Sequence, residues 1–210
     1  MKRVVITGLG AITPIGNNLE EYNEGLKKGQ SGAGPITRFD ASNFKTKFAC
    51  EVKNFNPEDF IDRKEVRRMD LFTQFAMVCS DEALADSKLL ESTLDLDRIG
   101  VIWGSGIGGL RSLEAEIETF ATGNGIPRFN PFMIPKMISD IAPGYISIKH
   151  GFRGINYCTV SACASATHAM MNAFDYIRLG KADAIITGGS EAAITATGMG
   201  GFSATKALSE

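Results

Sequence analysis

One cysteine stands where the chain is expected to change from a strand to a helix. Residues 155–160 mix β-branched and aromatic side chains as a short buried strand does. From Ala162 onward apolar side chains recur at helical spacing, at Ala166, Met170, Phe174 and Ile177. Cys163 therefore falls at the start of the expected helix. Free N–H groups and the positive end of the helix dipole stabilise a thiolate there, or the oxyanion of a thioester under attack.

The residues around Cys163 are all small, namely Ala162, Ala164, Ser165 and Ala166. Their size would let another backbone segment, or a long thin substrate, come close to the thiol. Composition alone supports a second interpretation, in which Cys163 is a buried free cysteine packed as a small hydrophobe. The choice between a nucleophile and a packing residue therefore depends on the rest of the chain.

Strands and helices alternate on both sides of this turn. The residue patterns predict strands over 2–6, 98–103, 155–160 and 182–187, and helices over 19–26, 57–87, 136–148 and from 162 to about 180. Residues 31–56 lack a clear period and predict an elaborated loop with short strands, whose apolar rings need burial at Phe39, Phe44, Phe48 and Phe55. This alternation predicts an α/β fold with a mixed or largely parallel sheet, covered by helices on both faces.

A glycine-rich loop, GSGIGG at residues 104–109, follows the second of these strands. It fits the G-x-G-x-x-G pattern that holds a dinucleotide pyrophosphate before a helix, so nucleotide binding is one alternative function. Two features weaken this alternative. No acidic residue ends a following strand about twenty residues on, where such sites need one for the ribose. The helix that would face the phosphates also carries Glu114, Glu116 and Glu118.

Basic residues gather within the helical region expected at 57–87. Arg63, Lys64, Arg67 and Arg68 lie on neighbouring turns, so their charges share much of one face. Most such clusters form a solvated helix surface, and the functional alternative is a docking patch for an acidic partner. The same region continues with residues at core-facing spacing, which are Phe72, Phe75, Ala76 and Cys79.

Composition limits the remaining functions. The chain has 210 residues, 44% of them hydrophobic, and a formal net charge of −2, which is ordinary for one soluble globular domain. This charge gives no reason to expect nucleic acid or an anionic membrane as a partner. Four cysteines without a C-x-x-C pair and only two histidines make a zinc site or a disulfide framework unexpected. No stretch reaches the length of a membrane span, and the apolar start fits a core strand better than a signal peptide, so the reducing cytoplasm is the expected compartment.

Five motifs in one order make the chain similar to a known family. They are TGLGAITPIG at 7–16, GSGIGGL at 104–110, VSACASATH at 160–168, GGSEA at 188–192 and GGFSATKALS at 200–209. Together they resemble the elongating 3-oxoacyl-acyl-carrier-protein synthases, most closely the type II enzymes of bacterial fatty acid synthesis, in the thiolase-like superfamily. Members of that family are about twice this long. The resemblance implies that residues 1–210 form the N-terminal half-domain of a thiolase-like αβαβα layered fold, with the C-terminal half absent and the sheet incomplete at its C-terminal end.

The resemblance also implies roles for particular residues. Cys163 would carry the acyl group as a thioester, and the acyl pocket would be lined by Ile107, Phe132, Met133 and Phe202. Contacts with the acidic acyl-carrier protein would come from Lys64, Arg67, Arg68, Arg128 and Lys206. The family further implies a homodimer. It implies no metal and no other cofactor, because the substrates arrive on the phosphopantetheine arm of the carrier protein.

The implied reaction is a decarboxylative Claisen condensation, in which an acyl chain on Cys163 joins malonyl-acyl-carrier protein during fatty acid elongation. The family's two catalytic histidines belong to the half that this sequence lacks. His168 follows Cys163 by five residues, about 140° round an ideal helix, so the two side chains would point apart. Three alternatives stay open. They are a cysteine hydrolase that pairs Cys163 with His150, a non-catalytic half-synthase or carrier-protein-binding module, and a dinucleotide-binding protein.

Overall fold

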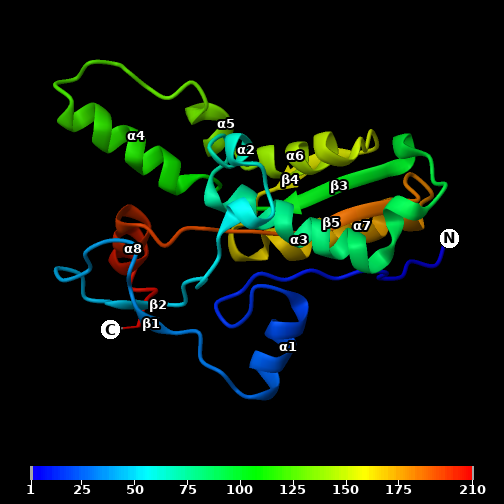
Figure 1. Ribbon diagram of the computed structural model, residues 1–210, viewed down its shortest axis with the longest axis horizontal. Helices are drawn as coiled ribbons and strands as arrows, with labels where there is room; N and C mark the ends of the chain where they lie inside the picture. The colour runs from blue at the N-terminus through cyan, green and yellow to red at the C-terminus, as the bar shows by residue number, and fades with distance from the viewer. Residues whose placement is uncertain (1, 210) are drawn as a thin grey trace.

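The computed structural model describes residues 2–209 and has the expected α/β architecture (Figure 1). Its helices are α1 (Leu19–Lys27), α2 (Arg63–Val66), α3 (Leu71–Ser87), α4 (Leu110–Thr122), α5 (Met133–Met137), α6 (Ile141–His150), α7 (Ser165–Arg178) and α8 (Ala196–Ala204). The strands are β1 (Gly34–Pro35), β2 (Phe48–Ala49), β3 (Ile99–Gly104), β4 (Asn156–Thr159) and β5 (Ala184–Gly189). Short 3-10 turns lie at Pro57–Asp59, Leu89–Glu91, Leu96–Arg98 and Ala162–Ala164.

Three parallel strands form the main sheet, in the order β4-β3-β5. The central strand β3 pairs with β4 through Trp103 and Cys158, and with β5 through Trp103 and Gly188. The largely parallel sheet predicted from the sequence is thus confirmed. Because all three strands run the same way, their carboxyl ends meet at one edge, and the turn that carries Cys163 starts from this edge.

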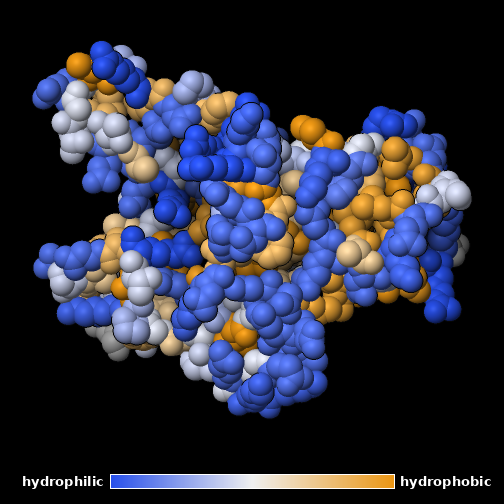
Figure 2. Space-filling model, viewed as in Figure 1, coloured by the Kyte–Doolittle hydropathy of each residue, from blue (hydrophilic) through white to orange (hydrophobic). Residues whose placement is uncertain are grey.

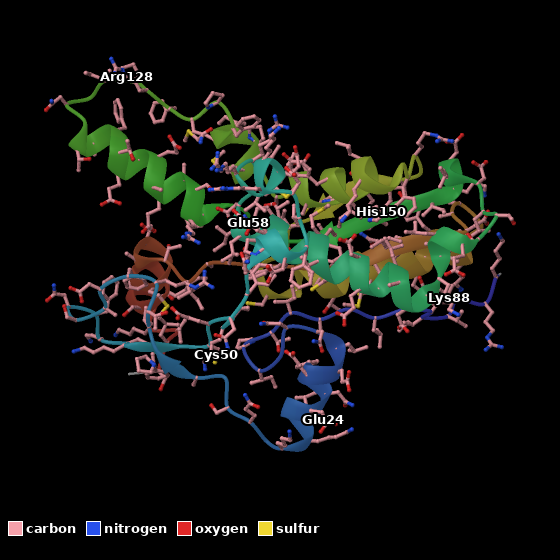
Figure 3. All side chains as sticks on the ribbon, viewed as in Figure 1. Glu24, Cys50, Glu58, Lys88, Arg128 and His150 are labelled. Atoms are coloured by element: carbon pink, nitrogen blue, oxygen red, sulfur yellow. The ribbon has the colours of Figure 1, made fainter. Side chains whose placement is uncertain are left out.

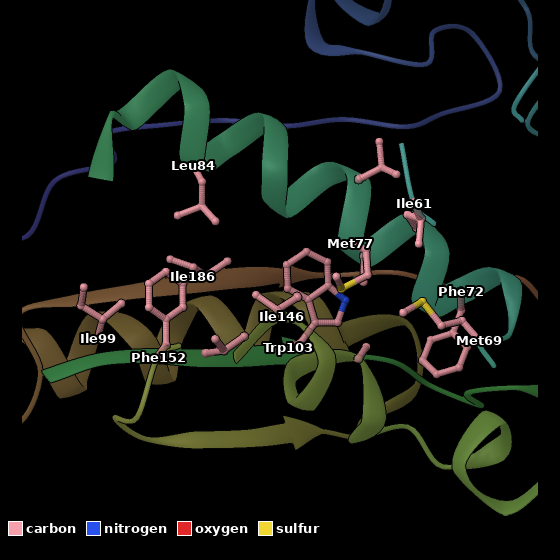
Figure 4. Packing of buried hydrophobic residues seen from close by; sticks show 14 residues of the cluster. Ile61, Met69, Phe72, Met77, Leu84, Ile99, Trp103, Ile146, Phe152 and Ile186 are labelled. Carbon is pink, nitrogen blue, oxygen red and sulfur yellow. The ribbon is translucent and has the colours of Figure 1, made fainter. Parts of the chain in front are cut away.

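Helices cover both faces of the sheet. The odd-numbered residues of β3 point toward α3 and α6, whereas Ile102 packs against Ala169 and Ala173 of α7. Figure 4 shows α3 lying over the sheet, with Trp103 and Ile146 in the core near it. The chain therefore has three successive layers, which are α3 with α6, the sheet, and α7.

The helical region expected at 57–87 is divided into a 3-10 turn, α2 and α3. Two aspartates set the divisions, because the carboxylate of Asp62 accepts an N–H at the start of α2 and that of Asp70 does so at the start of α3. The predicted core face of α3 is nevertheless confirmed, since Phe72 and Ala76 are fully buried. Cys79 packs against the same core, and burial raises the pKa of its thiol to about 12.

The strand expected at residues 2–6 does not form. The following residues lie on α3 instead, and a Cβ atom on Gly8 or Gly10 would come within 2.1 Å of a carbonyl oxygen of that helix. The carboxylate of Glu82 on α3 also accepts a backbone N–H from this segment. In the described part of the chain no strand pairs with the N-terminal segment, and Ile6 is 83% exposed. Its β-branched pattern suits a strand, but the neighbouring strand is not supplied by these residues.

The expected loop with short strands is present, because β1 and β2 pair antiparallel within it. Phe39 packs edge-on against Phe44 with ring centroids 5.1 Å apart, and Phe55 packs against Phe75 in the same way. The expectation that Phe48 is buried is wrong, since this residue is 42% exposed. A ladder of two residues per strand has no second layer to cover its outer side.

Within residues 2–209, two surfaces near the main sheet are not covered by other elements. The outer edge of β5 pairs with no strand among residues 2–209. The outer face of α7 is apolar and exposes Met170, Met171 and Phe174, while its alanines face the sheet. The expected incomplete sheet is therefore observed. Glu210, after which a further strand is expected, lies outside the described residues.

Candidate active site

Cys163 lies in the turn that joins β4 to α7. The 3-10 turn Ala162–Ala164 leads directly into α7, so the thiol stands at the N-terminal end of a helix as predicted. Its side chain is exposed, which contradicts the alternative of a buried packing residue. Ala162 has a φ of 51°, in the left-handed region that costs a non-glycine residue roughly 1–2 kcal/mol. Strain of this kind clusters at functional sites.

Hydrogen bonds fix the turn around the thiol. The hydroxyl of Ser165 donates to the carbonyl of Ala162 at 2.7 Å and accepts the N–H of Ser161 at 2.9 Å. The hydroxyl of Thr159 donates to the carbonyl of Ser165 at 2.8 Å. Among the described residues, the backbone N–H of Cys163 has no acceptor. This N–H is free to hold an oxyanion beside the thiol.

Glycines at the ends of two strands let the turn sit directly on the sheet. A Cβ atom on Gly104, at the end of β3, would lie 2.4 Å from the carbonyl carbon of Ser165. One on Gly189, at the end of β5, would lie 2.6 Å from the Cβ of Ala166. The close approach of another backbone to the small residues around Cys163 is therefore confirmed, and the sheet supplies that backbone.

The glycine-rich loop after β3 is closed by a carboxylate. One oxygen of Glu191 accepts the N–H groups of Gly106 and Ile107 at 2.7 and 3.1 Å, and the other accepts the hydroxyl of Ser105 at 3.3 Å. The N–H of Gly108 donates to the Ser105 hydroxyl oxygen at 3.1 Å. These donors are therefore already bonded, and the negative charge of Glu191 lies where a pyrophosphate would have to bind and would repel it. The geometry therefore argues against dinucleotide binding.

Neither histidine is placed to act as a base for Cys163. His150 ends α6, and its Nε2 lies 2.9 Å from the carboxylate of Asp81 on α3 (Figure 3). Burial opposes ionisation of Asp81, but hydrogen bonds from His150 and the adjacent lysine keep the pKa of this carboxyl below its usual value. The strand β4 separates His150 from Cys163, so the two residues stand at opposite ends of it. The Nδ1 of His168 lies 2.6 Å from the hydroxyl of Ser161. The hydrolase alternative therefore has no support in the geometry.

Four of the basic residues expected to meet a carrier protein line one cleft. This cleft has a volume of about 660 Å³ and lies between the α2 region, α4 and the loop that leads to α5. Lys64, Arg67 and Arg68 come from the α2 region, and Arg128 comes from the loop, near its outer end in Figure 3. The structure therefore brings together residues that lie far apart in the sequence.

Two contacts shape this basic cleft. The carboxylate of Glu116, the single acidic group of the lining, accepts the N–H of Asn130 at 3.0 Å and ties the loop to α4. The guanidinium of Arg68 lies 5.1 Å from the ring centroid of Phe132, within reach of a cation–π contact. The cleft thus has a basic wall and an aromatic wall.

The residues expected to line an acyl pocket do not all meet. Ile107 lies in the glycine-rich loop and is 40% exposed. Met133 begins α5, which is attached to the end of that loop because its last carbonyl accepts the N–H of Gly109 at 3.0 Å. Phe132, the residue before it, faces the basic cleft. Ile107 directly follows Gly106, on which a Cβ atom would lie 3.5 Å from the Cα of Ala162, so this expected pocket residue lies near the Cys163 turn.

The other two expected contact residues belong to the α8 region. Phe202 is 43% exposed and is therefore not a core residue among residues 2–209. Lys206 is exposed just after α8 and is not part of the lining of the basic cleft. The carboxylate of Glu114 on α4 accepts the N–H of Thr197 at 3.0 Å. Burial by itself would raise the pKa of Glu114, but hydrogen bonds of this kind keep it below its usual value. This contact joins α4 to α8, and Figure 2 shows the surface hollowed between these two helices.

Among residues 2–209, no group of three His, Cys, Asp or Glu side chains is arranged to hold a metal ion. No described helix is long and apolar enough to cross a membrane. Cys158, in β4, is half-buried, and burial raises the pKa of its thiol.

The family profile described as "Beta-ketoacyl synthase, N-terminal domain" matches residues 1–210. The chain belongs to the beta-ketoacyl synthase family. Among curated relatives, 3-oxoacyl-[acyl-carrier-protein] synthase 2 of Synechocystis sp. is 50% identical over 208 residues, and the protein of that name from Staphylococcus aureus is 48% identical. Each alignment covers 99% of this chain and 50% of the relative. The chain thus spans about half the length of the curated relatives it matches.

Solved structures agree with this assignment. The ishigamide ketosynthase/chain length factor matches this chain with a TM-score of 0.89 at 29% identity, over 98% of this chain and 51% of that one. The likeness confirms the predicted thiolase-like α/β fold.

Sequence patterns did not reveal the roles of Glu191 and Ser165 around the Cys163 turn. Glu191 lies in the GGSEA motif, and the available signal is an acidic residue just after the glycines that end β5. From the sequence, Ser165 is noted only as a small residue near Cys163. In the structure its hydroxyl holds the turn together by hydrogen bonds to the backbone of Ser161 and Ala162. Both act through the backbone, which residue type alone does not reveal.

Proposed function

We propose that this chain carries the nucleophile of a decarboxylative Claisen condensation in fatty acid elongation. An acyl thioester on Cys163 would join malonyl-acyl-carrier protein to give 3-oxoacyl-acyl-carrier protein. The observation that carries the proposal is the exposed Cys163 thiol in a strained turn, beside its own unbonded N–H. The name of the relatives, 3-oxoacyl-[acyl-carrier-protein] synthase 2, supports the same substrate class. The proposed reaction uses no metal and no cofactor. We also propose that it takes place in the cytoplasm.

The first half-reaction loads the acyl chain. The thiolate of Cys163 attacks the carbonyl carbon of an acyl thioester on the carrier protein, and the Cys163 N–H with a second donor holds the tetrahedral oxyanion. Collapse of this intermediate breaks the bond to the phosphopantetheine sulfur. That sulfur leaves and takes up a proton, while the acyl chain stays on Cys163 as a thioester.

The second half-reaction needs groups that this chain does not place near the thiol. Malonyl-carrier protein loses CO₂, and the electron pair of the broken C–C bond forms an enolate that attacks the acyl-cysteine and releases the Cys163 thiolate. The enolate requires hydrogen-bond donors, but His150 is bonded to Asp81 and His168 to Ser161. The proposal therefore assigns this role to histidines of a second half.

Residues 1–210 are, in this proposal, an N-terminal half-domain that a second half completes. The apolar outer face of α7 supports it, because exposed patches of this kind mark interfaces. The unpaired edge of β5 supports it as well, because such an edge accepts a further strand. A homodimer belongs to the same proposal, and the exposed apolar residues of α4 and the loop after it, Ile117, Phe120 and Ile126, offer a surface for it.

Mass spectrometry of the intact chain tests the proposed function. After incubation with acyl-loaded carrier protein, the mass should rise by one acyl group, which peptide mapping should place on Cys163. Joining the chain to the unmatched half of the Synechocystis relative should then permit condensation with malonyl-carrier protein. If the joined protein takes no acyl group, the condensing function is wrong.

Charge reversal in the basic cleft should weaken carrier-protein docking. We expect Arg67→Glu with Arg68→Glu to raise the apparent KM for acyl-carrier protein about tenfold, which is about 1.4 kcal/mol, since the partner is acidic. The rate of acyl transfer from a small acyl-pantetheine thioester should stay unchanged, because that substrate lacks the carrier protein. Initial rates of Cys163 acylation at several substrate concentrations give both values.

A matched control reverses two adjacent charges elsewhere. Lys27→Glu with Lys28→Glu changes the net charge equally at the end of α1, outside the cleft lining. It should change neither the KM for acyl-carrier protein nor the rate with the small acyl-pantetheine thioester. Equal KM values for the cleft variant and the unchanged protein would remove the docking surface from the proposal.

The basic cleft also favours a second candidate function, that of a non-catalytic module that binds carrier protein. Its lining does not include Cys163, so docking need not lead to acyl transfer. This candidate predicts binding of carrier protein without any acyl adduct. It also predicts that Cys163→Ala leaves the function untouched.

A further inference from the structure

The loop that follows β3 is held by one side chain from another strand. Glu191 comes two residues after the end of β5, yet it accepts N–H groups from two consecutive residues of this loop, at 2.7 Å from Gly106 and 3.1 Å from Ile107. Consecutive backbone N–H groups that point to one place form a concavity for an anion. Here the carboxylate of the protein itself fills that concavity.

A second set of bonds makes the loop a closed unit. Ser105 is buried, and its hydroxyl donates to Glu191 at 3.3 Å while it accepts the N–H of Gly108 at 3.1 Å. Hydrogen bonds to an ionised carboxylate are stronger than those between neutral groups. Loss of Glu191 would therefore leave three donors of one short loop without an acceptor.

The loop also touches the turn of the nucleophile. A Cβ atom on Gly106 would lie 3.0 Å from the carboxylate of Glu191 and 3.5 Å from the Cα of Ala162, which directly precedes Cys163. Gly106 is thus confined between Glu191 on one side and the Cys163 turn on the other. The next residue, Ile107, projects from this fixed point and is 40% exposed.

We propose that Glu191 is a positioning residue that fixes the 105–108 loop against the Cys163 turn, and so sets how an acyl chain on Cys163 passes Ile107. Only the effect on the path of the acyl chain rests on the proposed acyl-transfer function; the hold on the loop does not. Glu191 touches neither the thiol nor the substrate in this account. Its effect passes through the two N–H groups that it accepts.

Hydrogen–deuterium exchange of the 210-residue chain tests the hold on the loop. We expect amide exchange in the peptide that covers residues 105–108 to be about tenfold faster in Glu191→Ala, because its N–H groups lose their acceptor. Glu191→Gln should restore most of the protection, since an amide oxygen still accepts. Glu118→Ala is the matched control, because the Glu118 carboxylate has no partner among the described residues, and it should exchange as the unchanged chain does.

Acyl transfer tests the consequence at Ile107. The ratio of palmitoyl to octanoyl transfer onto Cys163 should change at least about threefold in Glu191→Ala and return toward the original ratio in Glu191→Gln, whereas Glu118→Ala should keep the original ratio. Unchanged exchange in Glu191→Ala would overturn the proposal, and so would a chain-length ratio equal to that of Glu118→Ala. If the unchanged chain, alone and joined to a second half, accepts no acyl group, the proposed function fails, and the exchange experiment still decides whether Glu191 holds the loop.

Discussion

Replacement of Cys163 by serine should lower the condensation rate at least about a thousandfold, because a serine hydroxyl ionises far less readily than a thiol and is a far weaker nucleophile than a thiolate. His150 and His168 cannot compensate as bases, since His150 is bonded to Asp81 and His168 to Ser161. Serine differs from cysteine by one atom, so the turn should keep its conformation. The measurement is 3-oxoacyl product formed by the chain joined to a second half, with a thermal melt to verify folding.

Cys50 provides the matched control for this substitution. It is another exposed free thiol, and it lies in the loop region after β2, outside the Cys163 turn. Cys50→Ser should keep the original condensation rate and still accept one acyl group. A Cys163→Ser protein that keeps more than about a tenth of the original rate would contradict the assignment of the nucleophile.

Gly104→Ala should displace the nucleophile by moving the helix that carries it. The new Cβ would lie 2.4 Å from the carbonyl carbon of Ser165 and 2.5 Å from the N of Ala166, and both are backbone atoms that cannot turn aside. Overpacking of this kind costs about 3 kcal/mol, which should lower the Tm of a domain of this size by roughly 6–12 °C. The rate of acyl transfer to Cys163 should fall as well, because the start of α7 must shift away from β3.

Gly144→Ala is the corresponding control. Gly144 lies in α6, and an added Cβ would meet nothing within 4 Å. Because alanine favours the helix, we expect a gain of about 0.5–1 kcal/mol and an unchanged acyl-transfer rate. If Gly104→Ala melted at the original temperature and accepted acyl groups at the original rate, the close contact between β3 and α7 would not be needed to position Cys163.

Much of the fold follows from local patterns. The central strand, α1 and the core face of α3 form where residue spacing predicts them, because their apolar residues are buried by elements within the chain. The N-terminal strand does not form, although its β-branched residues suit one. A strand requires a neighbouring strand, and residue spacing does not reveal whether that neighbour is present. The division of the 57–87 region can be predicted from Asp62 and Asp70, because aspartate is a favourable residue at the N-cap of a helix.

The candidate site is predictable in part. The place of Cys163 follows from the change of period at the end of β4, and the basic cleft follows from charge spacing only for the members near α2. Arg128 joins the cleft through the course of a long loop, which no local pattern determines. Glu191 is hidden for the same reason, because its partners lie on a loop more than eighty positions earlier in the chain.

The order of the strands has a consequence during synthesis. The central strand β3 is completed at Gly104, but its neighbours begin only at Asn156 and Ala184. At translation speeds of roughly 5–20 residues per second, β3 leaves the ribosome several seconds before β5 does. Ile102, buried in the folded protein against Ala169 and Ala173 of α7, lacks these partners until α7 is made. During synthesis both edges of this apolar strand therefore stay without a partner strand for several seconds, a condition that favours aggregation of a nascent chain.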